Sequence, residues 1–186
     1  MLQEAKLKEP YANIRSDIQK TAYASYWAEL VNAWMEENVS SGPLFALLKY
    51  ALGALDQDHD REQVLSILFQ VQFLNLSGHS PNLASCISCR RKLEELGQPF
   101  LGFNLPAGGI ICRQCGGSKD SVRLSLGTIK QLLWVQSGDL KKAARIRFSP
   151  NGTQEALALL EAFVPYHLGR QLKSLKFLRQ IRRKID

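Results

Sequence analysis

Cys86-Ile87-Ser88-Cys89 and Cys112-Arg113-Gln114-Cys115 hold all four cysteines of this 186-residue chain. Within each segment two residues separate the cysteines, a spacing that lets one tight turn direct both sulfurs at the same ion. Two such turns supply a complete tetrahedron of thiolates and leave no coordination position for a substrate or a water. The sequence therefore predicts a structural zinc site formed by Cys86, Cys89, Cys112 and Cys115.

Other uses of paired cysteines fit this chain less well. Disulfide bonds require an oxidising compartment, yet residues 1–8 carry several charges and no apolar segment of a secretory signal. A redox Cys-x-x-Cys pair normally stands alone at the start of a helix, which two copies do not match. An iron–sulfur cluster stays open, because four thiolates also bind one. His79 precedes the first pair and could replace a ligand, but we expect an ordinary loop histidine, since four thiolates already complete the site.

A β-hairpin is expected between the two cysteine pairs. The 22 residues that separate the pairs exceed the usual span of about 15–20 and leave room for two strands. Phe100 to Phe103 and Ile110 to Ile111 have the apolar, β-prone character of short strands, and Pro106 to Gly109 supplies a turn between them. The arrangement predicts a zinc-ribbon-like hairpin.

Apolar residues recur at helical spacing on both sides of this hairpin. In the first helix, Tyr23, Trp27 and Trp34 belong to an apolar stripe that we expect in the core. The third helix is apolar on nearly every side, which indicates the centre of the core. Helices are expected at residues 11–38, from Pro43 to Leu55, from the acidic loop 56–60 to Gly78, and at residues 125–136, 139–146 and 153–168.

These patterns predict a mainly helical fold, a helical domain with an inserted four-cysteine zinc-ribbon-like β-hairpin. Residues 1–82 form the first part of the helical core, residues 83–120 the zinc-binding hairpin, and residues 121–186 the second part of the core with a basic tail. The hydrophobic content of 45% suits a core of this size. No apolar run approaches the roughly 18 residues that span a bilayer, so we expect a soluble, cytoplasmic protein.

Positive charge concentrates in the second part of the chain. Residues 1–60 carry 5 Lys and Arg against 9 Asp and Glu, whereas residues 61–186 carry 19 against 8, which favours a polyanionic partner. In the tail, Leu172, Leu175 and Leu178 recur every three residues, so a helix would dock through them and expose its cations. The alternative is a solvated helix end whose cations suit the helix dipole.

We favour nucleic-acid contact for this tail. A second basic cluster, Arg90 to Lys92, follows the first cysteine pair. For this cluster, contact with a phosphate backbone and a hydrated surface turn are equal alternatives. No recognition helix with base-reading side chains is evident, so binding should not depend on base sequence. Phe100, Phe103 and Tyr166 could stack on bases, but we expect them to be buried. The candidate DNA-binding residues are Arg90, Arg91, Lys92, Arg170, Lys173, Lys176, Arg179, Arg182, Arg183 and Lys184.

Catalytic motifs are missing from the sequence. It contains no Gly-x-Ser-x-Gly nucleophile turn and no His-Glu-x-x-His pair, and its three histidines lie in unrelated contexts. We therefore expect no enzymatic activity.

Four segments, together with the cysteine pairs, resemble the C-terminal helical and zinc-bearing region of the RecO family of bacterial recombination mediators. They are residues 9–17 (EPYANIRSD), 22–26 (AYASY), 107–112 (AGGIIC) and 166–178 (YHLGRQLKSLKFL). Each segment alone is a weak signal, but the four in this order are specific for the family. The resemblance covers nearly the whole chain.

The resemblance implies a non-enzymatic DNA-binding protein of DNA repair, recombination and the DNA damage response, cytoplasmic and associated with the nucleoid. Members of the family anneal complementary strands. With RecR, they help load RecA on strands covered by single-stranded-DNA-binding protein, whose acidic and apolar tail they contact. The resemblance carries over the four cysteines as zinc ligands, and Arg170, Lys173 and Lys176 as part of the basic surface. Family members begin with an OB-fold, and this chain starts where that fold would end.

Other functions remain open on the residues alone. One is a zinc-ribbon module associated with transcription or RNA, which shares the ribbon but not the tail motif. Another is a protein-binding adaptor without DNA-binding activity, as expected if DNA contact depends on the OB-fold. A zinc enzyme would need an open coordination position, which four thiolates do not leave.

Overall fold

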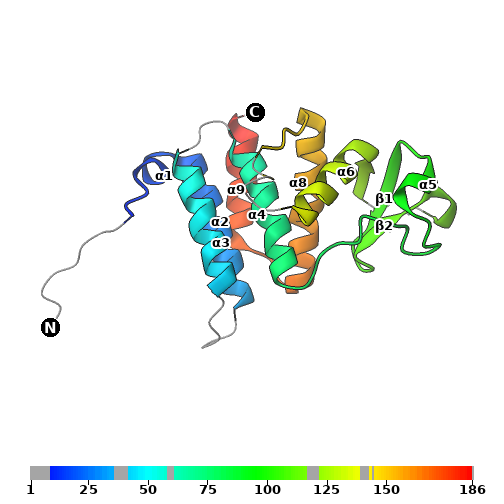
Figure 1. Ribbon diagram of the computed structural model, residues 1–186. Coiled ribbons are helices and arrows are strands. Elements are labelled where there is room, and N and C mark those ends of the chain that lie inside the picture. The colour runs from blue at the N-terminus through cyan, green and yellow to red at the C-terminus, as the bar shows by residue number, and fades with distance from the viewer. Residues whose placement is uncertain are drawn as a thin grey trace, which may run out of the picture.

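The computed structural model describes residues 9–35, 42–57, 61–116, 122–138, 143 and 145–185, with the side chains of the last two residues of this range left out. Helices dominate, and a three-stranded antiparallel sheet lies at one end of the row that they form (Figure 1). The expected fold class, mainly helical with a small cysteine-bearing β element, is therefore confirmed. Within the described part of the chain, no helix has both the length and the apolarity needed to cross a bilayer.

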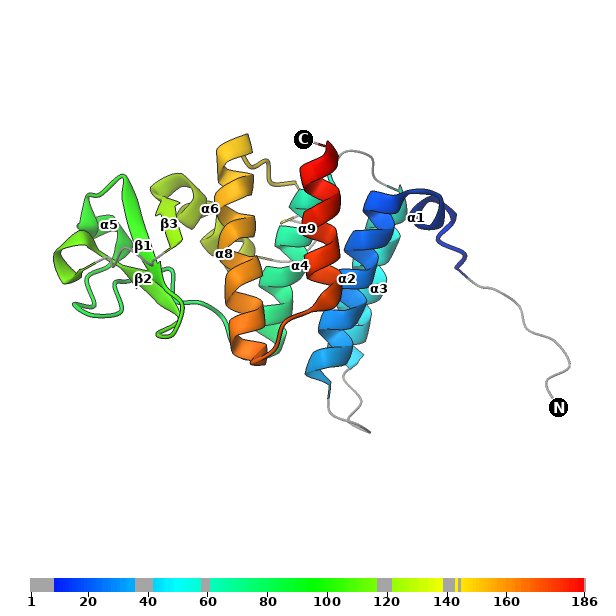
Figure 2. The ribbon, with the colours of Figure 1, turned by 180° about the vertical axis from the view of Figure 1, so that it is seen from behind.

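Long helices build the core. Their bounds are α1 Ala12–Ser16, α2 Ile18–Trp34, α3 Gly42–Gln57, α4 Glu62–Leu76, α6 Leu126–Ser137, α8 Pro150–Leu168 and α9 Lys173–Ile185. The central helix is α4, which contacts α2, α3, α6 and α8, as its nearly uninterrupted apolar surface predicts. Figure 2 shows α4 behind α8 and α9.

Polar groups on α4 have partners inside this core. Trp27 stacks on Phe69, with ring centroids 5.1 Å apart, and its Nε1 donates to Ser66 Oγ at 3.3 Å. The Tyr26 hydroxyl donates to Gln70 Oε1 at 2.8 Å. These pairs allow polar side chains at buried positions, because each buried donor or acceptor keeps a hydrogen bond. The prediction that the aromatic residues of the first long helix are core residues is confirmed for Tyr23 and Trp27, while Trp34 is half-buried.

Two helix boundaries differ from expectation for local reasons. The helix expected at residues 11–38 is two helices, because the Asp17 carboxylate accepts from the backbone N–H groups of Gln19 and Lys20 and caps a new start. The helix expected from residue 153 begins at Pro150, where a proline fits the first turn, and Ser149 caps it. Residues 36–38, most of the helix expected at residues 139–146, and residues 58–60 of the acidic loop lie outside the described residues.

The sheet contains one strand that the sequence did not predict. Strands β1 Phe100–Asn104 and β2 Gly109–Ile111 are the expected hairpin, and β3 Val122–Ser125 pairs antiparallel with the other side of β1. The order is β2-β1-β3. Phe103 on the inner face meets Phe163 of α8 edge to face, with ring centroids 5.3 Å apart. This contact joins the sheet to the helical core.

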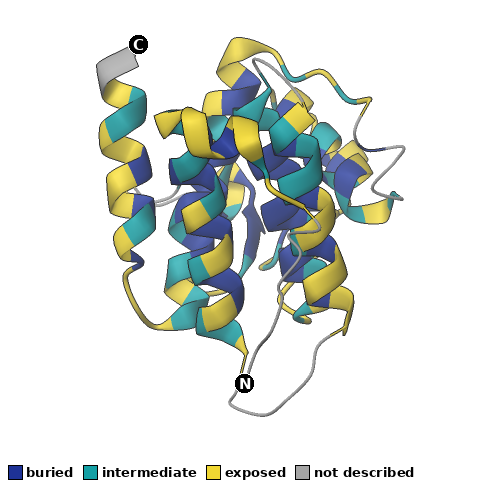
Figure 3. Ribbon diagram, turned by 90° about the vertical axis from the view of Figure 1, so that its left-hand side faces the viewer, coloured by how far each residue is buried: buried dark blue, intermediate teal, exposed yellow. Residues whose placement is uncertain are grey.

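The basic tail forms α9, which packs against α2. Leu172, Leu175 and Leu178 are buried, while Lys173 and Lys176 are exposed, as the three-residue repeat predicts. Figure 3 shows this division along the helix that ends at the C-terminus, with buried residues toward the body and exposed residues away from it. The expectation of a docked amphipathic tail is confirmed.

Candidate metal centre and nucleic-acid interface

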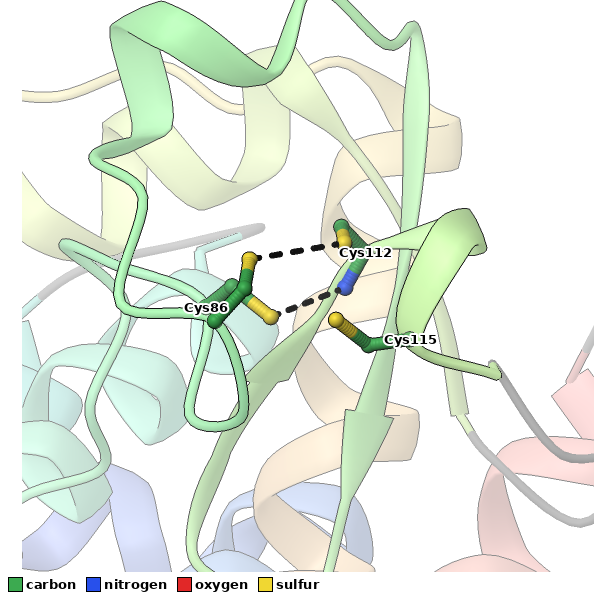
Figure 4. A group of neighbouring side chains, drawn as sticks. Cys86, Cys112 and Cys115 are labelled. Carbon is green, nitrogen blue, oxygen red and sulfur yellow. Dashed lines mark hydrogen bonds between the residues drawn. The ribbon is translucent and has the colours of Figure 1, made fainter.

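The four cysteines come together from three segments. Cys86 and Cys89 lie in the loop before β1, Cys112 directly follows β2, and Cys115 ends the short helix η1, Arg113–Cys115. All four sulfurs lie within 4.8 Å of one another, and Cys89 Sγ is 3.9 Å from Cys112 Sγ. Figure 4 shows the side chains of Cys86, Cys112 and Cys115 directed into a common space. All four are free thiols.

This geometry fits a four-coordinate metal ion. A tetrahedral zinc site with Zn–S bonds of about 2.3 Å requires sulfurs about 3.8 Å apart, close to the Cys89–Cys112 separation. Among the described residues, this cysteine group is the one cluster of three or more metal-ligating side chains. The four residues could therefore hold one metal ion.

Backbone hydrogen bonds hold the segments that carry the sulfurs. In the first loop, the N–H of Arg90 donates to the Cys86 carbonyl at 2.9 Å, which closes the turn. The N–H of Ile87 donates to the Ile110 carbonyl at 2.9 Å and holds this loop against β2. The N–H of Cys112 donates to Cys86 Sγ at 3.4 Å. The loop and the strand end thus form one rigid support.

Arg91 belongs to the cysteine cluster in this structure. Its Nε donates to Cys89 Sγ at 3.4 Å, and its Nη2 approaches Cys112 Sγ at 3.7 Å and bonds to Gln114 Oε1. The guanidinium lowers the pKa of Cys89 to about 6, whereas the hydrogen bond with Cys112 raises the pKa of Cys115 to about 12. The four sulfurs lie within 4.8 Å of one another, and thiolates this close repel each other, so a divalent cation between them would favour their ionisation.

His79 lies apart from the sulfurs. Its Nδ1 is 2.7 Å from the Ser77 carbonyl oxygen, and its ring meets Trp34 and His167 edge to face, with centroids 4.7 and 5.4 Å away. It is an exposed loop histidine with two ring contacts, in agreement with the expectation from sequence.

On α9 the candidate DNA-binding cations fall into two groups. Lys173, Lys176 and Arg183 are exposed on its outer side. Arg179 Nε contacts Glu161 Oε2 at 3.0 Å, and Arg182 forms a second ion pair with the same carboxylate. Glu161 is 4% exposed, so two of the expected surface cations neutralise a buried charge of α8.

The remaining candidates lie at separate places. Arg90 and Lys92 are exposed at the end of the cysteine loop, and Arg170 is exposed in the turn before α9. The side chain of Lys184 lies outside the described residues. Figures 1 and 2 place α8 between α9 and the sheet, so the structure does not bring the two basic clusters together.

Comparison with known proteins identifies the family. The family model described as recombination protein O C terminal matches residues 15–176. The chain is 44% identical to the DNA repair protein RecO of Desulfosudis oleivorans over 98% of its own length and 72% of that protein. The chain belongs to the RecO family.

Further relatives give the same result. The DNA repair protein RecO of Desulfatibacillum aliphaticivorans is 44% identical over 99% of this chain and 72% of the relative. The DNA repair protein RecO of Syntrophus aciditrophicus is 33% identical over 98% of this chain and 70% of the relative. The resemblance inferred from the sequence segments is confirmed, and this chain is a RecO-family DNA repair protein.

In this RecO-family chain, one expectation about aromatic residues is wrong. Phe103 is buried, but Phe100 and Tyr166 are 42% and 50% exposed. Phe100 begins β1 on the face opposite Phe103, because side chains alternate along a strand. Sequence reasoning also missed Glu161, although an acid four residues after Leu157 in an apolar stripe is a signal for a buried ion pair.

Proposed function

We propose that this RecO-family chain acts in DNA repair as a non-enzymatic mediator that binds DNA without base specificity and contacts repair proteins. The observation that carries this proposal is the structure of α9. Its leucines anchor it to the body, so its exposed cations form a fixed row instead of a mobile tail. Fixed cations that repel one another are stabilised by a polyanion, and counterion release from phosphates adds to the binding free energy.

The cysteine cluster would hold a structural zinc ion in this function. Four thiolates leave no position for substrate, so the ion would supply a crosslink between the first loop, the end of β2 and η1. The residues at its edge, Arg90 and Lys92, would then contact phosphates from a rigid support. This zinc assignment rests on the donor set and on the sulfur separations.

The resemblance to the RecO family supports a proposal about protein partners. We propose that the chain contacts single-stranded-DNA-binding protein and RecR, and that these contacts serve strand annealing and RecA loading. A hollow of about 490 Å³ between α8 and α9 supports a site for an acidic, apolar-ended peptide. Pro165, Leu172 and Leu175 line it, and Lys176 and Arg183 border it. A second candidate function, a protein adaptor without DNA binding, is favoured by the neutralisation of Arg179 and Arg182.

Titration with fluorescent single-stranded DNA at several salt concentrations tests the proposal. The affinity should fall as the salt concentration rises. Replacing Lys173, Lys176 and Arg183 together by Gln should weaken binding. It should also reduce the slope of log K against log salt concentration by up to about 0.7 for each phosphate contact that is lost. Lys130→Gln, at an exposed position of α6, is the matched control and should bind like the wild type. Failure of the wild type to bind DNA at low salt, with retained binding of a partner peptide, would favour the adaptor.

A further inference from the structure

The outer face of the sheet carries an exposed aromatic ring and a guanidinium in contact. Arg123 of β3 lies over the Phe100 ring of β1, with its Cζ 4.1 Å from the ring centroid. Phe100 is 42% exposed and Arg123 is also exposed. Packing in the core would explain a buried aromatic ring. This ring is exposed, and the planar cation that covers it is exposed as well, so the pair offers flat groups at the surface.

The register of the sheet builds this pair. Arg123 is opposite Gly102, and Phe100 is opposite Ser125. Because Gly102 has no side chain, the Arg123 side chain can extend along the face to its diagonal neighbour Phe100. The pair therefore stands on two hydrogen-bonded strands, and its geometry does not depend on a loop.

The hairpin region that carries the pair has an excess of positive charge, which favours an anionic partner. The described residues of the hairpin region, 83–116 and 122–125, include 5 Lys and Arg and 2 Asp and Glu. Exposed Arg90, Lys92 and Arg113 belong to this set. One acid of α8, Glu155, is near Arg123. Burial raises the pKa of Glu155, but hydrogen bonds from Thr128 and Ser125, with the Arg123 charge, outweigh burial and lower it.

We infer that Phe100 and Arg123 form a base-stacking platform for single-stranded DNA. A base stacks on the open face of the guanidinium or on the ring, and the positive charge attracts the adjoining phosphate. Stacking accepts every base, since each has a π-face, which suits binding without base specificity. This inference rests on the proposed DNA-binding function and adds a second contact region, separated from α9 by α8.

Four variants and two probes test the platform. Phe100→Leu removes the ring but keeps an apolar side chain, and Arg123→Lys keeps the charge but removes the planar group. Phe100→Tyr retains the ring and should bind like the wild type. Phe45→Leu is the matched control, since Phe45 is 66% exposed on α3, at the other end of the helical row from the sheet. Unchanged melting temperatures show that the variants fold.

The probes are oligothymidylate and an abasic oligonucleotide of equal length, titrated by fluorescence anisotropy. Phe100→Leu and Arg123→Lys should each weaken binding of oligothymidylate about 5-fold or more, and leave abasic binding nearly unchanged. Wild-type affinity of both variants for oligothymidylate would overturn the platform but leave the proposed function intact. A wild type that binds neither probe at low salt would overturn the proposed function and the platform together.

Discussion

Gly109 shows how one residue controls the cysteine loop. A Cβ at this position would lie 2.4 Å from Ile87 Cγ2 and 2.9 Å from the Asn82 carbonyl oxygen. The N–H of Ile110 donates to that same carbonyl at 2.9 Å, so the loop before β1 can approach β2 only because residue 109 has no side chain. The sulfurs of Cys86 and Cys112 meet as a result of this approach.

Gly109→Ala should therefore destabilise the protein. The added methyl group must displace a backbone carbonyl and a branched side chain, which costs about 1–3 kcal/mol in free energy of unfolding. Gly53→Ala is the control, because a Cβ there meets nothing within 4 Å and the residue lies inside α3. That control should stabilise the helix by about 0.5–1 kcal/mol. Chemical denaturation of both variants measures the two values, and equal stability would contradict the role of Gly109.

The buried carboxylate of Glu161 is a second test at this scale. Glu161→Ala leaves Arg182, whose side chain is 13% exposed, without its partner and should lower the free energy of unfolding by about 3 kcal/mol. The control is Glu9→Gln, which breaks an exposed pair with Lys49 and should change stability little. Urea denaturation measures the free energy of unfolding of both variants. A loss for Glu161→Ala as small as that for Glu9→Gln would show that the ion pairs of Glu161 contribute no more than surface pairs do.

At the scale of elements, α9 depends on a contact from α2. The Glu29 carboxylate accepts hydrogen bonds from the backbone N–H groups of Lys173 and Ser174, at 3.2 and 2.8 Å, and from the Ser174 hydroxyl. These are N–H groups that a helix start leaves unpaired. Burial raises the pKa of Glu29, but the hydrogen bonds from Ser174 and Lys173 and the charge of Arg170 outweigh it and lower the pKa.

This cap predicts a pH dependence of stability. Because the folded pKa of Glu29 lies below the usual value of 4.5, its contribution is complete above that pH and is lost as the pH falls through the folded pKa. Glu29→Gln should lower the free energy of unfolding by about 1 kcal/mol at neutral pH. The difference from the wild type should shrink in acid. A difference that stays constant between neutral pH and acid would refute the cap.

Elements with local signals were predictable from the sequence, and elements with non-local causes were not. The α9 leucine repeat and the cysteine spacing are local patterns, and both appear in the structure as expected. Strand β3 has only the four residues Val122–Ser125, and its pairing with β1 joins segments about twenty residues apart along the chain. The exposure of Phe100 depends on that same pairing. The break at Asp17 had a capping signal that the continuous apolar stripe obscured.

At the scale of the whole molecule, the sheet and the helices form one hydrophobic core. Phe103 and Phe163 link the two parts, and buried residues of both belong to the same cluster. The boundaries expected at residues 82 and 120 remain a prediction about how the chain divides. A metal at the cysteines would stabilise the hairpin directly, and would affect DNA or partner binding through the positions of Arg90, Lys92 and the platform.

Loss of the metal should therefore lower the melting temperature of the protein and leave most of its affinity for single-stranded DNA. Cys112→Ser removes a buried ligand at the end of β2, and the melting temperature should fall by several degrees because metal-binding free energy contributes to folding. Binding of single-stranded DNA below the new melting temperature should persist, since α9 is separate from the hairpin. A melting temperature equal to that of the wild type would exclude a structural metal.

Spectroscopy of the cobalt-substituted protein tests the metal centre, and with it the scaffold on which the binding surfaces stand. We expect the absorption of a tetrahedral site with four thiolates, unchanged when azide or imidazole is added, because no coordination position is open. A spectrum that shifts with added ligand, or one without thiolate charge-transfer bands, would contradict a closed structural site at Cys86, Cys89, Cys112 and Cys115.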